Sequence, residues 1–109
     1  MDRSLRRLRS DNVSSAAWKQ IERTVALLVG GERTWNSPEH IDVEVEGYAI
    51  EVKNVTAPSI SQVEGWLRHN RPKAESKGLK SALVVKRRAG RGTPTPYLAI
   101  FELTEPIID

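Results

Sequence analysis

One stretch, HIDVEVEGYAIEVKN at residues 40–54, constrains the fold most, because apolar and acidic residues alternate along its first half. A period of two is typical of a β-strand with one buried face and one polar face. Glu46–Gly47 then interrupts the alternation, and glycine accepts the positive φ angle that a two-residue hairpin turn requires. The stretch therefore predicts a β-hairpin, and counting outward from a two-residue turn puts Asp42 opposite Glu51. A longer or bulged turn would shift this register.

The expected Asp42–Glu51 pair would hold two carboxylates about 4.5–5.5 Å apart across the hairpin. At ~5 Å and an effective dielectric constant of ~20, their repulsion is on the order of 3 kcal/mol, a large share of a typical folding free energy of about 5–15 kcal/mol. A positive charge should therefore lie between them. Lys53, on the same face as Glu51, can supply it, and the residues then form a charged outer face of the hairpin. A divalent cation with oxygen ligands is the other explanation.

A helix is expected before the hairpin, because Asn12 or Ser14 can act as its N-cap and Gly30–Gly31 can end it. Glu22 lies at the edge of its apolar stripe, where it is either a functional acid or part of a solvated helix face. The stripe has spacings of three and four and consists of Trp18, Ile21, Val25 and Leu28.

The second half predicts a helix that opens near Pro58–Ser59 and is broken or restarted at Pro72. Its apolar stripe consists of Ile60, Val63 and Leu67. SALVVK is typical of a strand that is buried on both faces, and YLAIFEL at 97–103 is a closing strand. The expected fold class is α/β in one domain, residues 1–109, in the order α-β-β-α-β-β, with a mixed central sheet flanked by helices.

Charge is divided unevenly along the chain: residues 1–51 hold 7 Lys/Arg against 9 Asp/Glu, and residues 52–109 hold 10 against 5. A basic half beside an acidic centre fits a protein that binds a polyanion, with the acids as a metal-binding spot. Residues 1–12 are expected to form a basic N-terminal arm. The cations expected to contact DNA phosphates are Arg3, Arg6, Arg7, Arg9, Arg68, Arg71, Lys86, Arg87, Arg88 and Arg91.

The absence of cysteine excludes disulfides and Cys-ligated metal sites, and suits a reducing cytosol. No apolar run is long enough to span a membrane, and the Arg-rich start lacks the apolar region of a signal peptide. No Ser/His/Asp arrangement is discernible, and no glycine-rich phosphate loop follows a strand.

Glu22 on a helix, Asp42 on a strand and Glu51-Val52-Lys53 on the next strand together resemble the PD-(D/E)xK nuclease superfamily. The chain is most similar to its small phage- and archaeal-type Holliday-junction resolvases. This resemblance implies that Asp42, Glu51 and the backbone carbonyl of Val52 bind Mg²⁺ or Mn²⁺. It implies that Lys53 orients or activates the attacking water, and that Glu22 completes the site as an accessory acid or metal ligand.

The resemblance extends downstream, since Gln62-Val-Glu-Gly-Trp66 is similar to the Q-x-x-x-Y element of several branches, with tryptophan in place of tyrosine. Gln62 is therefore added to the expected catalytic residues. The proline that usually precedes the motif aspartate is replaced by Ile41. His40 would face Lys53 in the hairpin register, where it is either a ligand or base, or more simply a surface residue.

The expected function is a magnesium-dependent endodeoxyribonuclease that acts on branched DNA in recombination and repair, as a homodimer. The expected location is the cytoplasm of a bacterial, archaeal or phage-infected cell. A repair or nicking endonuclease on the same fold is one alternative. A non-catalytic DNA-binding protein that keeps the acids as structural residues is another.

Overall fold

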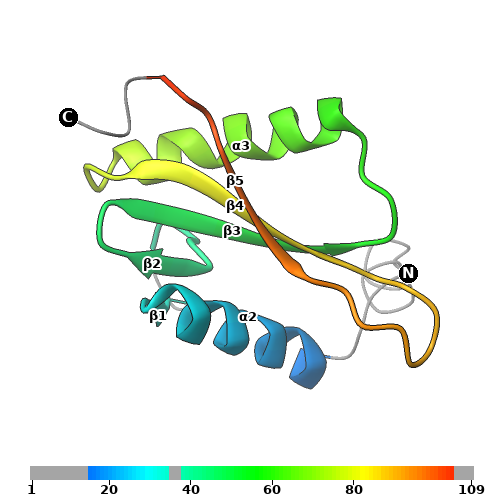
Figure 1. The fold of residues 1–109 in the computed structure, drawn as a ribbon. Helices are drawn as coiled ribbons and strands as arrows, with labels where there is room; N and C mark the ends of the chain where they lie inside the picture. The colour runs from blue at the N-terminus through cyan, green and yellow to red at the C-terminus, as the bar shows by residue number, and fades with distance from the viewer. Residues whose placement is uncertain (1–14, 35–37, 105–109) are drawn as a thin grey trace, which may run out of the picture.

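The computed structural model describes residues 15–34 and 38–104, and within them the chain forms an α/β fold of two helices and a five-stranded mixed open sheet (Figure 1). The elements in chain order are α2 (Ser15–Val29), β1 (Glu32–Arg33), β2 (Val43–Val45), β3 (Tyr48–Val55), α3 (Ile60–Glu75), β4 (Lys80–Arg87) and β5 (Tyr97–Phe101). None of the described helices is both long and apolar enough to cross a membrane.

The sheet has the strand order β1-β2-β3-β4-β5, and α3 makes the crossover between the parallel strands β3 and β4. All other neighbouring strands are antiparallel. The predicted hairpin and its register are confirmed, and Gly47 adopts a positive φ of 89° in the turn. The three pairs of the β2–β3 ladder are Val43–Ile50, Glu44–Ala49 and Val45–Tyr48.

The two helices cover opposite faces of the sheet, as Figure 1 shows. Because successive residues of a strand point to opposite faces, β3 divides its side chains between the two helices. Ile50 and Val52 pack with Val25 of α2, whereas Ala49 packs with Ala74 of α3. The expected face shared by Ala49, Glu51 and Lys53 is therefore the α3 face. The predicted fully buried strand is also confirmed, since the middle of β4 is buried.

Helix α2 ends where expected, because Gly30 has a φ of 72° and the Gly31 N–H donates to the Ala26 carbonyl at 2.9 Å. The predicted stripe is wrong at its last member, since Leu28 is 64% exposed. The helix is rotated so that Glu22 and Ala26 face the sheet instead. Apolar periodicity could not predict this rotation, because it depends on a partner for the buried acid.

Helix α3 begins directly after Ser59, as predicted, but the predictions for Ile60 and Pro72 are wrong. Ile60 is 74% exposed, because the buried face starts one turn later at Val63. Pro72 does not break the helix, which continues to Glu75. Pro72 has no N–H to donate to the carbonyl four residues earlier, and the helix continues past it for only three residues.

Two further differences concern the edges of the sheet. The predicted order lacked β1, whose two residues are too few to show a period. The closing strand ends at Phe101 rather than Leu103. β1 nevertheless matters for the site, because it brings Arg33 next to the start of β2.

Candidate active site

Asp42 lies immediately before β2, at the point where the ladder between β2 and β3 stops. Its main-chain carbonyl accepts the N–H of Thr34 at 3.0 Å, and its side-chain Oδ2 accepts the N–H of Val52 at 2.9 Å. The ladder therefore ends one pair short of the predicted Asp42–Glu51 opposition. The Asp42 carboxylate takes over the hydrogen bond that a longer β2 would have provided.

The pKa of Asp42 is raised from its ordinary 3.8 to about 6. Burial is the largest cause, because it disfavours the charged form, and the negative charges of Glu22 and Glu51 raise the pKa further. The hydrogen bond from Val52 and the positive charge of Lys73 act in the opposite direction. Three carboxylates from α2, β3 and the start of β2 thus share one electrostatic neighbourhood.

Glu51 and Lys53 form an ion pair on the α3 face of β3, with 3.1 Å between Oε2 and Nζ. The second carboxylate oxygen of Glu51, Oε1, is buried and accepts no hydrogen bond from the described residues. Lys53 Nζ also lies 5.2 Å from the centroid of the Trp66 ring on α3. Lys53 therefore neutralises only one side of Glu51, and the other oxygen is left for a further partner.

Glu22 is 5% exposed, so the interpretation of this residue as part of a solvated helix face is wrong. Its Oε1 accepts a hydrogen bond from Arg33 Nε at 2.7 Å, and the two side chains form an ion pair. Sequence reasoning missed Arg33. No local pattern could have identified it, because the need for a cation follows from the burial of Glu22, which the sequence does not show.

A surface hollow of about 220 Å³ joins Glu22 to Asp42. Its lining contains two further cations and an aromatic ring, and consists of Trp18, Lys19, Glu22, Arg33, His40, Ile41 and Asp42. Trp18 lines this hollow and is only partly buried. The hollow gives the acid pair access from outside the protein.

His40 is exposed and has a positive φ of 62°, so it lies outside the β2 ladder and is not held opposite Lys53 by strand pairing. Its side chain lines the hollow, and its carbonyl accepts a hydrogen bond from Lys73 Nζ at 3.4 Å. This contact brings Lys73, a residue that sequence reasoning did not select, to the vicinity of Asp42.

Gln62 forms the capping box of α3: its side-chain Oε1 accepts the Ser59 N–H at 2.8 Å, and its own N–H donates to Ser59 Oγ at 3.1 Å. The side chain is exposed and caps the helix. A catalytic role for Gln62 would have to be compatible with this capping. Trp66, one turn later, is the member of this element that contacts a residue of the acidic motif.

The oxygen atoms at this site only partly match the ligand set that a hard divalent cation requires. Asp42 and Glu51 offer carboxylate oxygens, and one or two carboxylates together with water and phosphate are a common Mg²⁺ environment. The Val52 carbonyl points to the same side of β3 as its N–H, toward Asp42, because both groups of one strand residue share a side. However, no group of three or more His, Asp or Glu side chains is close enough to hold a metal within the described parts of the chain.

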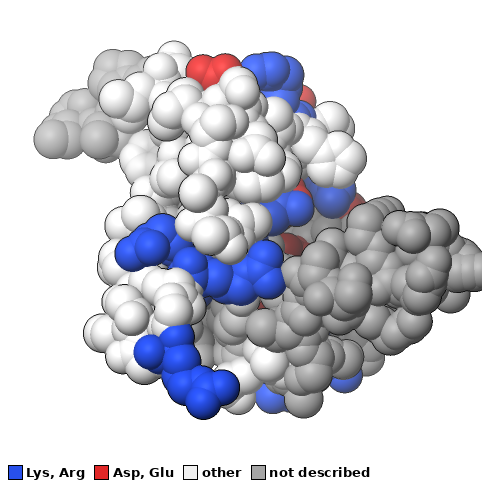
Figure 2. Space-filling model, turned by 90° about the vertical axis from the view of Figure 1, so that its right-hand side faces the viewer, with Lys and Arg blue, Asp and Glu red and all other residues white. Residues whose placement is uncertain are grey.

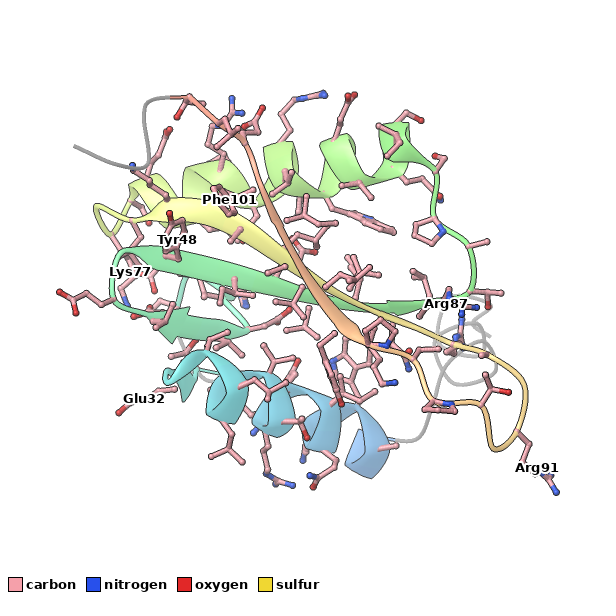
Figure 3. All side chains as sticks on the ribbon, viewed as in Figure 1. Glu32, Tyr48, Lys77, Arg87, Arg91 and Phe101 are labelled. Carbon is pink, nitrogen blue, oxygen red and sulfur yellow. The ribbon has the colours of Figure 1, made fainter. Side chains whose placement is uncertain are left out.

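Cations gather at the end of the molecule where β3 and β4 finish. Figure 2 views this end, where Lys and Arg atoms are spread over the surface and Asp and Glu atoms are visible at the upper edge and, deeper, near the centre of the view. Arg87 and Arg91 both lie here, far from Tyr48 and Lys77 at the other end (Figure 3). The β4–β5 connection that carries Arg91 is thus on the same side of the molecule as the end of β3.

Several of the other residues predicted to contact DNA already interact with other residues of the protein. Lys86 Nζ donates to the Thr95 carbonyl at 2.9 Å and lies 5.1 Å from the Tyr97 ring centroid. Arg68 pairs with Glu64 and Arg71 with Glu102. The arm at residues 1–12, with Arg3, Arg6, Arg7 and Arg9, lies outside the described residues.

Comparison of the chain with protein-family models, with curated proteins and with solved structures found no match.

Proposed function

We propose that the protein is a metal-dependent DNA endonuclease with a PD-(D/E)xK nuclease-like core that hydrolyses phosphodiester bonds in branched DNA. The helix, hairpin, helix and parallel strand follow one another in the order that this resemblance implies, with one short strand added at the edge. Glu22 lies on the expected helix and Glu51 and Lys53 lie on the expected strand, whereas Asp42 lies directly before the strand that was expected to contain it.

One observation carries the proposal. Asp42 lies directly before β2, where the β2–β3 ladder ends, and the charges of Glu22 and Glu51 both act on its carboxylate. Holding like charges together costs folding free energy, because each carboxylate disfavours the ionised form of the next. Such an arrangement is typical of functional sites, where a cation or a proton is taken up.

In this proposal Asp42, Glu51 and the Val52 carbonyl would hold Mg²⁺ or Mn²⁺. The bound metal supplies Lewis acidity at the phosphate and a water of lowered pKa. Lys53, which forms an ion pair with Glu51, would orient or activate the attacking water. Glu22 acts as the accessory acid, and its ion pair with Arg33 holds its carboxylate in place near Asp42. Gln62 fixes the N-terminus of α3 through its hydrogen bond with the Ser59 N–H.

The proposed substrate follows from the shape of the domain and its charge. Arginines on the β4–β5 connection contact phosphates, which positions DNA without reading its sequence. Recognition of a branched shape suits a domain of this size. We include a homodimer in the proposal, because a junction has two strands to cut, and sedimentation of the protein with and without a four-way junction tests it.

The test is a gel assay on an end-labelled four-way junction and a linear duplex of the same sequence, each with Mg²⁺ or with EDTA. Asp42→Asn removes one proposed ligand, and Glu46→Gln, an exposed acid in the turn of the same hairpin, is the matched control. We expect paired nicks in the junction with Mg²⁺. The nicks should be absent in EDTA and in the Asp42→Asn variant, but present in the Glu46→Gln variant. Cutting of both substrates would favour a repair or nicking endonuclease.

A non-catalytic DNA-binding protein is the second candidate, and one observation favours it. The described residues contain no group of three acids or histidines close enough to bind a metal, so Glu51 and Lys53 can be read as a neutralised structural pair. This candidate expects DNA binding of equal strength in Mg²⁺ and in EDTA, with no cutting in any metal. That outcome would overturn the nuclease.

A further inference from the structure

Lys53 has two neighbours of different chemistry. Its ammonium forms an ion pair with Glu51 at 3.1 Å, and it lies 5.2 Å from the centroid of the Trp66 ring. Its side chain is only 29% exposed, so water screens the ammonium less than it would on an open surface. A cation at this distance over an indole ring is attracted by the negative face of the ring.

Trp66 is well suited to hold another side chain in place, because the ring itself is fixed. It packs against a buried cluster that contains Leu67 and Leu83. The capping box fixes α3 one turn before it. One turn after it, the buried Asn70 donates a hydrogen bond to the Ala49 carbonyl of β3 at 2.9 Å. The ring therefore lies between two points at which α3 is fixed.

Lysine needs such a support, because its long side chain has many rotamers and its ammonium is a flexible point charge. Glu51 alone would hold it by charge. However, Glu51 is also a proposed metal ligand, and a bound divalent cation would compete with Lys53 for the same carboxylate. The Trp66 ring carries no net charge, so its attraction for the ammonium persists when the Glu51 charge is shared.

We infer that Trp66 is a positioning residue, whose ring face holds the Lys53 ammonium beside Glu51. The catalytic part of this inference rests on the proposed nuclease function, whereas its geometric part does not. It gives a reason for tryptophan at this place in the helix, since an indole offers the strongest cation-binding face among the aromatic side chains.

The geometric arm uses NMR of protein labelled with ¹³C at the lysine ε-carbon. A lysine above an aromatic ring has its ε-proton resonance shifted upfield by the ring current. We expect such a resonance for Lys53, identified by its loss in Lys53→Met, and a second one for Lys86, which lies over Tyr97. Trp66→Leu should abolish only the Lys53 shift, and Trp66→Phe should keep part of it. An unshifted Lys53 resonance in the unmodified protein would overturn the inference.

The catalytic arm measures single-turnover cleavage of saturating DNA. Trp66→Leu should slow cleavage about tenfold, which corresponds to about 1.4 kcal/mol, while Trp66→Phe stays within about threefold of the unmodified rate. Val63→Ala is the matched control, because Val63 belongs to the buried cluster against which Trp66 packs. It should lower stability without changing the rate or the Lys53 resonance.

Equal slowing by Val63→Ala and Trp66→Leu, at similar loss of stability, would overturn the positioning role and make Trp66 a packing residue. If the unmodified protein cuts no DNA, the proposed function fails. The NMR arm then still decides whether Trp66 holds Lys53.

Discussion

The Asp42 carboxylate connects the folding of the chain to the chemistry proposed for it. Burial and the charges of Glu22 and Glu51 raise its pKa to about 6, whereas an unfolded chain would have the ordinary value of 3.8. The folded protein therefore binds a proton more tightly than the unfolded chain. Between about pH 4 and pH 6, the free energy of unfolding should fall as the pH rises. Above that range the full destabilisation by the ionised Asp42 carboxylate is present.

Asp42→Asn should consequently stabilise the protein near neutral pH. The amide removes the partly buried charge, and its oxygen can still accept the Val52 N–H. The shift of about two pKa units corresponds to on the order of 2 kcal/mol after allowance for the solvent that still reaches the carboxylate. The melting temperature at about pH 7.5 should rise by about 5–10 °C, measured by circular dichroism.

The control for this prediction is the same melting measurement near pH 4. Near pH 4 the native Asp42 is already protonated, so the variant and the unmodified protein should melt at nearly the same temperature. A gain of the same size at both pH values would mean that packing, and not the buried charge, distinguishes the two proteins. Glu46→Gln, in the exposed turn, should change the melting temperature little at either pH.

At the scale of elements, the end of α2 is set by two neighbouring glycines with different tasks. Gly30 has a positive φ and open space around its missing side chain. Gly31 has no positive φ, but a Cβ atom there would overlap the carbonyl oxygen of Glu44 in β2. The close approach of helix and strand at Gly31 carries β1 and Arg33 to the site.

Gly31→Ala should therefore destabilise the protein by about 3 kcal/mol or more, since the backbone of β2 would have to move. Gly30→Ala should cost about 1 kcal/mol, the usual price of a left-handed conformation for a residue with a side chain. Urea denaturation of both variants measures the difference. Equal losses would indicate that α2 can shift away from β2 without strain, and would contradict the close approach.

Two cations at the β4–β5 connection differ in their contacts with the protein. Lys86, near the end of β4, donates from Nζ to the Thr95 carbonyl in the connection, whereas Arg91, within the connection, extends outward at the end of the molecule (Figure 3). In the proposed DNA complex, Arg91→Ala should reduce the slope of log affinity against log salt by about one. Lys86→Met should change the slope by less than half as much, because its ammonium already has partners.

Fluorescence anisotropy of a labelled four-way junction over a range of salt concentrations measures both slopes. If Lys86→Met lowered the slope as much as Arg91→Ala, Lys86 would contact phosphate in the complex and leave Thr95. If neither variant changed the slope, DNA would not bind at this connection.

For the whole molecule, the parts that sequence could predict are those set by local pattern. The hairpin register follows from a period of two and from Gly47, and the buried strand β4 follows from its apolar run. These signals act over a few residues, so they do not depend on how the layers come together. The face shared by Glu51 and Lys53 was predictable for the same reason.

The parts that could not be predicted depend on contacts between distant residues. The rotation of α2 that exposes Leu28 follows from the Glu22–Arg33 ion pair, which joins a helix to a strand too short to show a pattern. The contact of Lys53 with Trp66 depends on the distance between α3 and β3. Hydrophobic periodicity contains no information on either contact, because it describes one element at a time.

The stability of the whole molecule should report metal binding without any DNA. A ligand that binds only the folded chain stabilises it by RT ln(1 + [L]/Kd), which is about 1.4 kcal/mol when Mg²⁺ is at about ten times its Kd. Near pH 7.5, Mg²⁺ should raise the melting temperature of the unmodified protein by on the order of 5 °C at matched ionic strength. The same addition should leave Asp42→Asn unchanged and should still stabilise Glu46→Gln. Near pH 5 the effect should fall to about a third, because the pKa of Asp42, about 6, leaves about nine-tenths of its carboxyl protonated there and the proton must be lost before the metal can bind. A rise of equal size in Asp42→Asn, or at pH 5, would mean that Mg²⁺ acts on the overall charge of the protein, and the metal site proposed at Asp42 would be lost.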